Sequence, residues 1–340
     1  MRMIAVQEAA GTVLCHDITR IVPGGDKGPA FRKGHVVRPE DVPELLRLGK
    51  EHLYVWEVGP GQVHEDDAAR RIATAVAGAG VVLTEPCEGR INILADRRGL
   101  LRINVDTLRR LNAIEDVAVA TLHGNIAVTP GQMLAGTRVV PLVVPDERLE
   151  AVEAVCATSG PVVWVQVFRA LRVGVVTTGS EVYHGRIEDK FGPVLRRKFG
   201  NLGCTVVRQV VVPDDRDMTV RAIRRLLAEG VELLAVTGGM SVDPDDLSPS
   251  SIRAAGGRVV AYGAPAFPGA MFLLAFLDDV PVVGLPGCVM YHRASVFDLL
   301  VPRLVAGERL TREDIVELGH GGLCAMCPDC RYPACGFGKS

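Results

Sequence analysis

The chain has 340 residues, of which 48% are hydrophobic and 23% charged, and its mean hydropathy is +0.22. Its 38 Lys and Arg residues are balanced by 40 Asp and Glu, so no strong basic field favours nucleic acid as a partner. The longest uninterrupted apolar run, residues 270–277, is far shorter than the ~20 residues of a membrane helix, and the N-terminus lacks the apolar region of a secretory signal. We therefore expect a soluble cytoplasmic protein of two or three domains, with no nucleic-acid or membrane partner.

The first half of the chain, residues 1–165, predicts a small α+β region with barrel-like short strands. Short runs of Val, Ile and Leu alternate there with Gly and Pro, which is typical of strands and turns. Apolar spacing predicts helices over residues 39–49, 65–77 and 105–112. The second of these starts on three acidic residues, which suit a helix N-terminus.

Residues 166–310 show a different pattern, in which apolar runs alternate with helical segments. The runs are residues 171–177, 204–212, 231–236 and 280–285. Apolar residues at spacings of three and four predict helices around 220–227 and 290–304. This alternation indicates a doubly wound α/β domain with a mostly parallel sheet, where ligands bind at the carboxyl ends of the strands.

Three loops after these strands have the composition of an anion site. Residues 177–181 (TTGSE), 237–241 (TGGMS) and 284–287 (GLPG) combine glycine with a following helix N-terminus, whose backbone N–H groups can bind a phosphate. Carboxylates that could hold Mg²⁺ accompany the loops; they are Asp189, Asp214, Asp215, Asp243, Asp245 and Asp246. For Asp214, Asp215 and Asp246, a helix N-cap is the alternative interpretation.

Six ordered segments carry a resemblance to a known family: residues 173–181 (VGVVTTGSE), 185–195 (GRIEDKFGPVL), 212–215 (VPDD), 237–249 (TGGMSVDPDDLSP), 268–269 (PG) and 284–287 (GLPG). Together they resemble the molybdopterin-binding domain of molybdenum cofactor biosynthesis proteins. That domain is a doubly wound α/β fold found in molybdopterin adenylyltransferase and in molybdopterin molybdotransferase, which inserts molybdate. Residues 34–54 and 131–141 are similar to parts that the molybdotransferase has outside this domain.

The resemblance implies a molybdotransferase-like enzyme that binds molybdopterin, or its adenylylated form, and uses Mg²⁺ and molybdate. Asp189 and Asp246 would be catalytic residues that place the Mg²⁺. The cofactor would be bound by Thr178, Gly179, Ser180, Glu181, Asp214, Asp215, Gly238, Gly239, Ser241, Pro286 and Gly287. A homodimer is also implied, and we expect the strand-rich N-terminal half to contribute its contacts.

Three departures from the molybdotransferase pattern leave other functions open. Ser180 stands where that family usually has Asp, residues 189–191 replace a DSN triplet, and residues 287–289 replace the end of GLPGNP. A non-catalytic carrier or chaperone that delivers the cofactor to a molybdoenzyme is therefore an alternative. Residues 246–249 look more like the adenylyltransferase version, which is a further alternative, whereas the retained Asp189 and Asp246 favour the molybdotransferase-like enzyme.

The end of the chain, residues 311–340, is rich in cysteine. Four of the nine cysteines lie there, namely Cys324, Cys327, Cys330 and Cys335. The C-x2-C-x2-C spacing lets neighbouring thiolates turn around one centre, and it resembles a ferredoxin run apart from the last gap. We predict a metal-binding tail with Zn²⁺ or an iron–sulfur cluster; disulfides and an unmetallated tail are the alternatives. Because the tail follows the last helix, loss of its metal should leave the core folded and the affinity for the pterin nearly intact, while impairing transfer to a partner.

Overall fold

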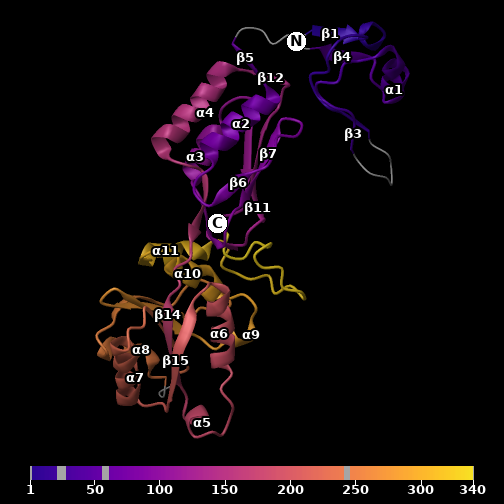
Figure 1. Cartoon of the computed structure of the whole chain (residues 1–340). Coiled ribbons are helices and arrows are strands. Elements are labelled where there is room, and N and C mark those ends of the chain that lie inside the picture. The colour runs from indigo at the N-terminus through magenta and orange to yellow at the C-terminus, as the bar shows by residue number, and fades with distance from the viewer. Residues whose placement is uncertain (1, 21–27, 56–60, 241–245, 340) are drawn as a thin grey trace. The chain divides into compact units, whose positions relative to one another are not determined.

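The computed structural model describes residues 2–20, 28–55, 61–240 and 246–339, and its contacts divide the chain into two compact units (Figure 1). Unit 1 comprises Met1–Asp96, Ile103–Leu122 and Gly131–Trp164. Unit 2 comprises Arg97–Arg102, His123–Pro130 and Val165–Ser340. The three domains predicted above, with boundaries at residues 165 and 310, stay a prediction.

Unit 1 is built on several small antiparallel sheets. Its strands are β1 (Arg2–Ala5), β2 (Ile18–Arg20), β3 (Gly28–Phe31), β4 (His52–Val55), β5 (Gln62–His64), β6 (Val81–Leu83), β7 (Arg90–Ala95), β9 (Val117–Thr121), β11 (Met133–Val139) and β12 (Val143–Pro145). One sheet has the order β6-β7-β11-β9, and β1–β4, β2–β3 and β5–β12 form pairs. Each of these sheets is open at both edges over the described ranges, so the expected barrel-like arrangement is wrong.

The helices of unit 1 include all three that the sequence predicts. They are the 3₁₀ turn η1 (Val6–Glu8), the 3₁₀ turn η2 (Pro39–Asp41) leading into α1 (Val42–Arg47), α2 (Glu65–Val76), α3 (Val105–Asn112) and α4 (Asp146–Ser159). The last was not predicted. Its apolar residues are spread around the helix, so they give almost no helical period.

Unit 2 is built on a six-stranded sheet of order β15-β14-β16-β19-β18-β17. Its strands are β14 (Arg172–Thr178), β15 (Thr205–Val212), β16 (Leu233–Thr237), β17 (Arg258–Tyr262), β18 (Leu273–Leu277) and β19 (Val280–Leu285). The four predicted apolar runs form the parallel strands β14, β15, β16 and β19, which confirms the α/β fold with a mostly parallel sheet. β17 and β18 are antiparallel additions. A smaller sheet has the order β10 (Ala127–Val128), β8 (Gly99–Ile103), β13 (Val163–Val167).

Helices cover both faces of the six-stranded sheet. They are α5 (Ser180–Tyr183), α6 (Phe191–Asn201), α7 (Arg216–Ala228), α8 (Ser248–Ala254), α9 (Cys288–Tyr291), α10 (Val296–Val305), α11 (Arg312–Val316) and the 3₁₀ turn η3 (Glu317–Gly319). Neighbouring residues of a strand point to opposite faces. Accordingly, Val175 of β14 belongs to a core with Phe199 of α6, and Val176 to another core with Ile223 of α7.

The helix predicted around residues 290–304 is in fact two helices, α9 and α10. Ser295 starts the second one, because its hydroxyl oxygen accepts a hydrogen bond from the Phe297 N–H and the Asp298 carboxylate accepts one from the Ser295 N–H. The apolar period continues across residues 292–295 and therefore hides the break. The S-x-x-D signature of a capping box was the signal that sequence analysis missed.

The cysteine-rich end packs against the core of unit 2. Phe337 is only 3% exposed and belongs to the same core as Phe199, and Cys324, Cys330 and Cys335 pack against that core. The tail is therefore part of the packing of unit 2. Among the described residues, none of the helices has the length and apolar character required to span a bilayer.

Candidate functional site

A cavity of about 860 Å³ lies at the carboxyl ends of the parallel strands of unit 2. It is lined by the loops after β14, β15 and β16, by the start of α6 and by α9. The lining residues are Thr177, Thr178, Gly179, Glu181, Val182, Ile187, Glu188, Asp189, Lys190, Phe191, Asp214, Gly238, Gly239, Asp246, Met290 and Tyr291. This is the position at which α/β sheets of this kind bind ligands.

The glycine turn after β16 lies directly against the loop after β14. Gly238 and Gly239 have φ angles of +83° and +52°, a conformation that favours glycine. A Cβ atom on Gly238 would lie 2.0 Å from the Thr178 carbonyl oxygen, and one on Gly239 would lie 3.1 Å from the Thr178 Oγ1. Ser248 fixes the turn by donating its hydroxyl to the Gly238 carbonyl at 2.8 Å. The two loops therefore pack closely beside the cavity, and neither glycine leaves room for a side chain.

Two of the predicted site carboxylates also hold the ends of helices. The Asp189 Oδ1 accepts the N–H of Phe191 at 2.9 Å, and its Oδ2 accepts the side-chain amide of Gln209 at 2.6 Å, so Asp189 fixes the start of α6 at the cavity. Asp215 caps α7 through the Met218 N–H at 2.6 Å and does not line the cavity. The N-cap interpretation is thus correct for Asp215.

The other predicted residues divide into three groups. Thr178, Gly179, Glu181, Asp214, Gly238, Gly239 and Asp246 line the cavity with Asp189. Ser180, Pro286 and Gly287 do not line it, although Ser180 is hydrogen-bonded to Asp214. Ser241, Asp243 and Asp245 lie outside the described residues.

The sequence analysis did not name Lys190, Met290 or Tyr291, which also line the cavity. Tyr291 is 77% exposed, so its ring is accessible to a ligand. The sequence indicates the region of Met290 and Tyr291, because α9 directly follows the GLPG loop that is predicted to belong to the site. The loop itself turns the chain, and the helix after it supplies the lining side chains.

The charge of the cavity is strongly acidic. Its charged lining residues are five carboxylates and one lysine, namely Glu181, Glu188, Asp189, Asp214, Asp246 and Lys190. An anionic ligand would be repelled unless a cation lay between it and the carboxylates. No group of three His, Cys, Asp or Glu in the described ranges is arranged to hold a metal ion. A divalent cation here would therefore need oxygens from the ligand or from water, as Mg²⁺ commonly does.

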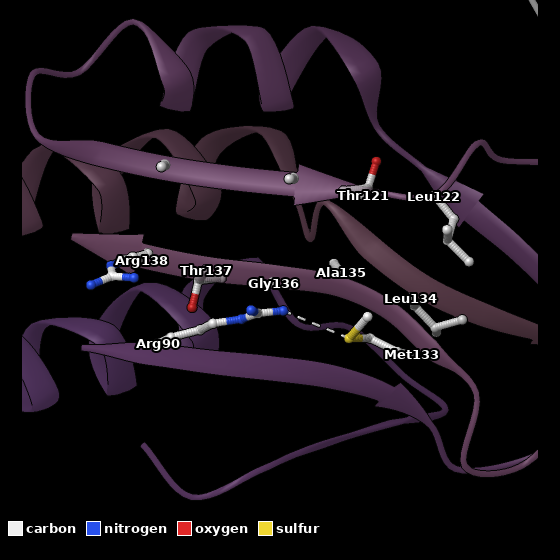
Figure 2. Close-up of a pocket in the computed structure, with 11 residues that line it drawn as sticks. Arg90, Thr121, Leu122, Met133, Leu134, Ala135, Gly136, Thr137 and Arg138 are labelled. Atoms are coloured by element: carbon white, nitrogen blue, oxygen red, sulfur yellow. Dashed lines mark hydrogen bonds between the residues drawn. The ribbon is translucent and has the colours of Figure 1, made fainter. Parts of the chain in front are cut away.

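A second cavity, of about 350 Å³, lies in unit 1 on the sheet that contains β7, β11 and β9 (Figure 2). The small residues Ala118, Ala120 and Gly136 leave the sheet surface hollow there, and the Arg90 side chain extends across it toward Met133. Its lining contains two arginines but no carboxylate, histidine or cysteine. This composition offers no general base to activate a hydroxyl and no carboxylate or imidazole for a divalent cation, so the cavity of unit 2 is the better candidate for chemistry.

Two family models match the chain. Residues 174–306 match a probable molybdopterin binding domain, and residues 3–57 match a domain of unknown function. The first match covers the six-stranded sheet and the strand-following loops that line the cavity of unit 2, so this part of the chain is a molybdopterin-binding domain of the α/β fold.

Curated relatives agree with this assignment. A molybdopterin molybdenumtransferase of Synechococcus elongatus is 26% identical over 176 residues, which are 49% of this chain and 44% of the relative. One of Staphylococcus aureus is 30% identical over 302 residues, 84% of this chain and 66% of the relative. The chain therefore spans less than two thirds of these relatives. The molybdopterin biosynthesis enzyme MoaB of Thermus thermophilus has a TM-score of 0.33 at 20% identity, covering 41% of this chain and 98% of that one.

Proposed function

We propose that this chain, which contains a molybdopterin-binding domain and is a distant homologue of the molybdopterin molybdenumtransferases, inserts molybdate into molybdopterin or its adenylylated form. The observation that carries the proposal is the glycine turn at Gly238 and Gly239, which lines the cavity and packs so closely on Thr178 that neither position has room for a side chain. A surface of this kind lets a phosphate approach the N–H groups of the chain.

The lining residues fit a phosphorylated pterin. Backbone N–H groups of the turn at Gly238 and Gly239 would bind the phosphate, and Lys190 supplies the one positive side chain of the lining. Tyr291 offers an exposed aromatic face to the ring system. When bound, molybdopterin supplies the dithiolene sulfurs that take up molybdenum.

The carboxylates that line the cavity explain why the proposed reaction would require Mg²⁺. Asp246 and Asp189 would hold the cation together with ligand oxygens, and the cation would offset the repulsion between the acidic cavity and an anionic pterin and molybdate. Asp189 is already held by the start of α6, so its oxygens have a fixed position. Catalysis by these groups consists of positioning and charge neutralisation.

A non-catalytic carrier of the finished cofactor is the second candidate. The replacement of the family's usual Asp by Ser180 favours it, because Ser180 leaves one carboxylate fewer near the cavity for a cation. Both candidates bind the pterin, but only the enzyme would insert molybdate in repeated turnovers. We further propose a homodimer, as the resemblance implies, which light scattering of the full chain at micromolar concentration tests directly.

The deciding experiment combines binding with turnover. The purified full chain is mixed anaerobically with molybdopterin or its adenylylated form and molybdate, with and without Mg²⁺, and the molybdenum retained on the pterin is measured over time. The enzyme requires multiple turnovers that depend on Mg²⁺. Binding of the molybdenum-loaded cofactor without any turnover identifies a carrier, and absence of pterin binding rejects both candidates.

A further inference from the structure

Residues 321–339 form a closed loop. The Gly338 N–H donates to the Gly321 carbonyl at 2.8 Å, so the two ends of the segment meet. Near the first end, the Cys324 N–H donates to the Phe267 carbonyl, also at 2.8 Å, which fastens the loop to the rest of unit 2. The segment has no helix or strand of its own. Loops of this length without regular structure are uncommon in compact domains and are generally functional.

All four cysteines of this loop line one cavity, of about 290 Å³. Cys324, Cys327, Cys330 and Cys335 are free thiols in the structure. Met326 has a φ angle of +52°, and its N–H donates to the Cys324 Sγ at 3.5 Å. N–H donors to cysteine sulfur are a usual feature of thiolate-ligated metal centres, because they stabilise the charge on sulfur.

The charged side chains that line the cavity are positive. They are Arg293 and Arg331, and the lining contains no carboxylate. Arg293 also donates to the Cys330 carbonyl at 3.5 Å, which holds the guanidinium at the loop. Thiolates bound to a metal centre leave a net negative charge, so this lining is complementary to such a centre and unsuited to a bare hydrated cation.

The sequence spacing of the thiols favours a cluster over a single zinc ion. Cys324, Cys327 and Cys330 follow the C-x2-C-x2-C pattern of a ferredoxin run, and Cys335 adds a fourth thiol to the same cavity. Zinc sites of four cysteines typically place two C-x2-C pairs about 15–20 residues apart, whereas the four thiols here lie within one short segment. Within the described ranges no three His, Cys, Asp or Glu side chains are arranged to hold a metal ion, so the thiols would have to turn toward the bound cluster.

We propose that the loop at residues 321–339 binds one 4Fe–4S cluster through Cys324, Cys327, Cys330 and Cys335. On binding, each thiol releases its proton to solvent and its sulfur bonds one iron, and the neighbouring Arg293 and Arg331 offset the negative charge. Consecutive residues line the two cavities. Met290 and Tyr291 line the proposed pterin cavity, and His292 and Arg293 line the cavity of the four cysteines. The proposal goes beyond the pterin function and does not depend on it, because its test measures iron and sulfide.

The full chain is purified anaerobically and also reconstituted with equal amounts of ferrous and ferric iron and with sulfide, which together supply the oxidation state of the resting cluster. We expect about four iron and four sulfide ions per chain, with the broad visible absorption of a cluster and a paramagnetic signal after reduction. Stoichiometric zinc that persists without iron would overturn the cluster in favour of a single-ion site. A reconstituted protein that takes up neither iron nor sulfide would overturn it as well.

Single substitutions identify the ligands. Cys327→Ser and Cys330→Ser should each lose most of the iron, whereas Cys87→Ser, which removes an exposed thiol of unit 1, should retain it. Circular dichroism of each variant shows whether it folds. If a Cys→Ser variant unfolds, the iron and sulfide content of the unaltered chain still decides the proposal, because that measurement needs no substitution.

Discussion

The Ser180 hydroxyl accepts a hydrogen bond from the Asp214 N–H at 3.2 Å, and the Asp214 carboxylate accepts one from the Ser180 N–H at 2.8 Å. This reciprocal pair ties the loop after β14 to the loop after β15. It also gives Ser180 a structural role at the position where the resembling family usually has Asp. A second carboxylate there would face Asp214 directly, and like charges at such a distance repel.

The first prediction concerns this pair. Ser180→Asp should lower the free energy of unfolding by roughly 1 kcal/mol without divalent cations, and Mg²⁺ should restore much of the loss by lying between the two carboxylates. Ser180→Ala, the matched control, loses one hydrogen bond but gains no charge, so its stability should be insensitive to Mg²⁺. Urea unfolding with and without Mg²⁺ measures both. Identical stability of the Asp variant under the two conditions would contradict the prediction.

The second prediction concerns the glycine turn. Gly239→Val adds a side chain where a Cβ atom would already lie 3.1 Å from Thr178 and 3.3 Å from Ser248. It should weaken molybdopterin binding tenfold or more, which corresponds to about 1.4 kcal/mol. Gly287→Ala is the control, because a Cβ atom there meets nothing within 4 Å. Anaerobic titration gives the affinities; an unchanged affinity in a folded Gly239 variant would reject the turn as the phosphate site.

A third prediction tests the metal role of Asp246. Asp246→Asn keeps the size of the side chain but removes its charge, so pterin binding should largely remain while Mg²⁺-dependent molybdenum insertion is lost. If Asp246 only supports the start of α8, Asn should serve nearly as well. Rates of insertion at several Mg²⁺ concentrations distinguish the two, and equal rates for the unaltered chain and the variant would count against metal binding.

The fourth prediction follows from Glu65, the first residue of α2, which is only 6% exposed. Burial, followed by the nearby Asp66 carboxylate, raises the pKa of Glu65 from 4.5 to about 7, despite the opposing charges of Arg138 and Lys33. The folded state therefore holds this proton more tightly than the unfolded state. The stability linked to it is complete below pH 4.5 and is lost as the pH rises to about 7.

Glu65→Gln removes this titration. The variant should match the unaltered chain near pH 4 and exceed its free energy of unfolding by roughly 1–3 kcal/mol at pH 8. Glu85→Gln, at a side chain that is 95% exposed, should leave the pH profile unchanged. Denaturant unfolding across this pH range measures both, and a Glu65 variant with a parallel profile would show that the carboxyl is well solvated.

The fifth prediction concerns the cysteine-rich end. Phe337→Ala removes a ring that is 3% exposed in the core of unit 2, and it should cost about 3 kcal/mol of stability. Leu323→Ala, in the same loop but at a 75% exposed side chain, should cost less than 1 kcal/mol. Thermal and urea unfolding compare the two. Equal stability of both variants would mean that the loop is not packed on the core.

The parallel strands and their loops could be predicted from the sequence because continuous apolar runs mark strands that are buried on both faces. The break before Ser295 could not be predicted in this way, because it lies inside a continuing apolar period. The packing of Phe337 could not be predicted either, because it depends on contacts between residues distant in the chain. Likewise, the GLPG motif predicted that the loop of Pro286 belongs to the site, but it did not predict that Tyr291 lines the cavity. The geometry of the following helix decides which of its side chains face the cavity.

The way the chain alternates between its two units limits how it can be divided. Residues 97–102 and 123–130 belong to unit 2 although unit 1 residues flank them on both sides. They carry most of β8 and all of β10, and β13 pairs with β8. A gene fragment that begins near residue 166 would therefore leave the rest of β13 with an unpaired edge, a known template for aggregation. Truncated versions of this protein should precipitate where the full-length chain stays in solution, unless the earlier segments are co-expressed with them.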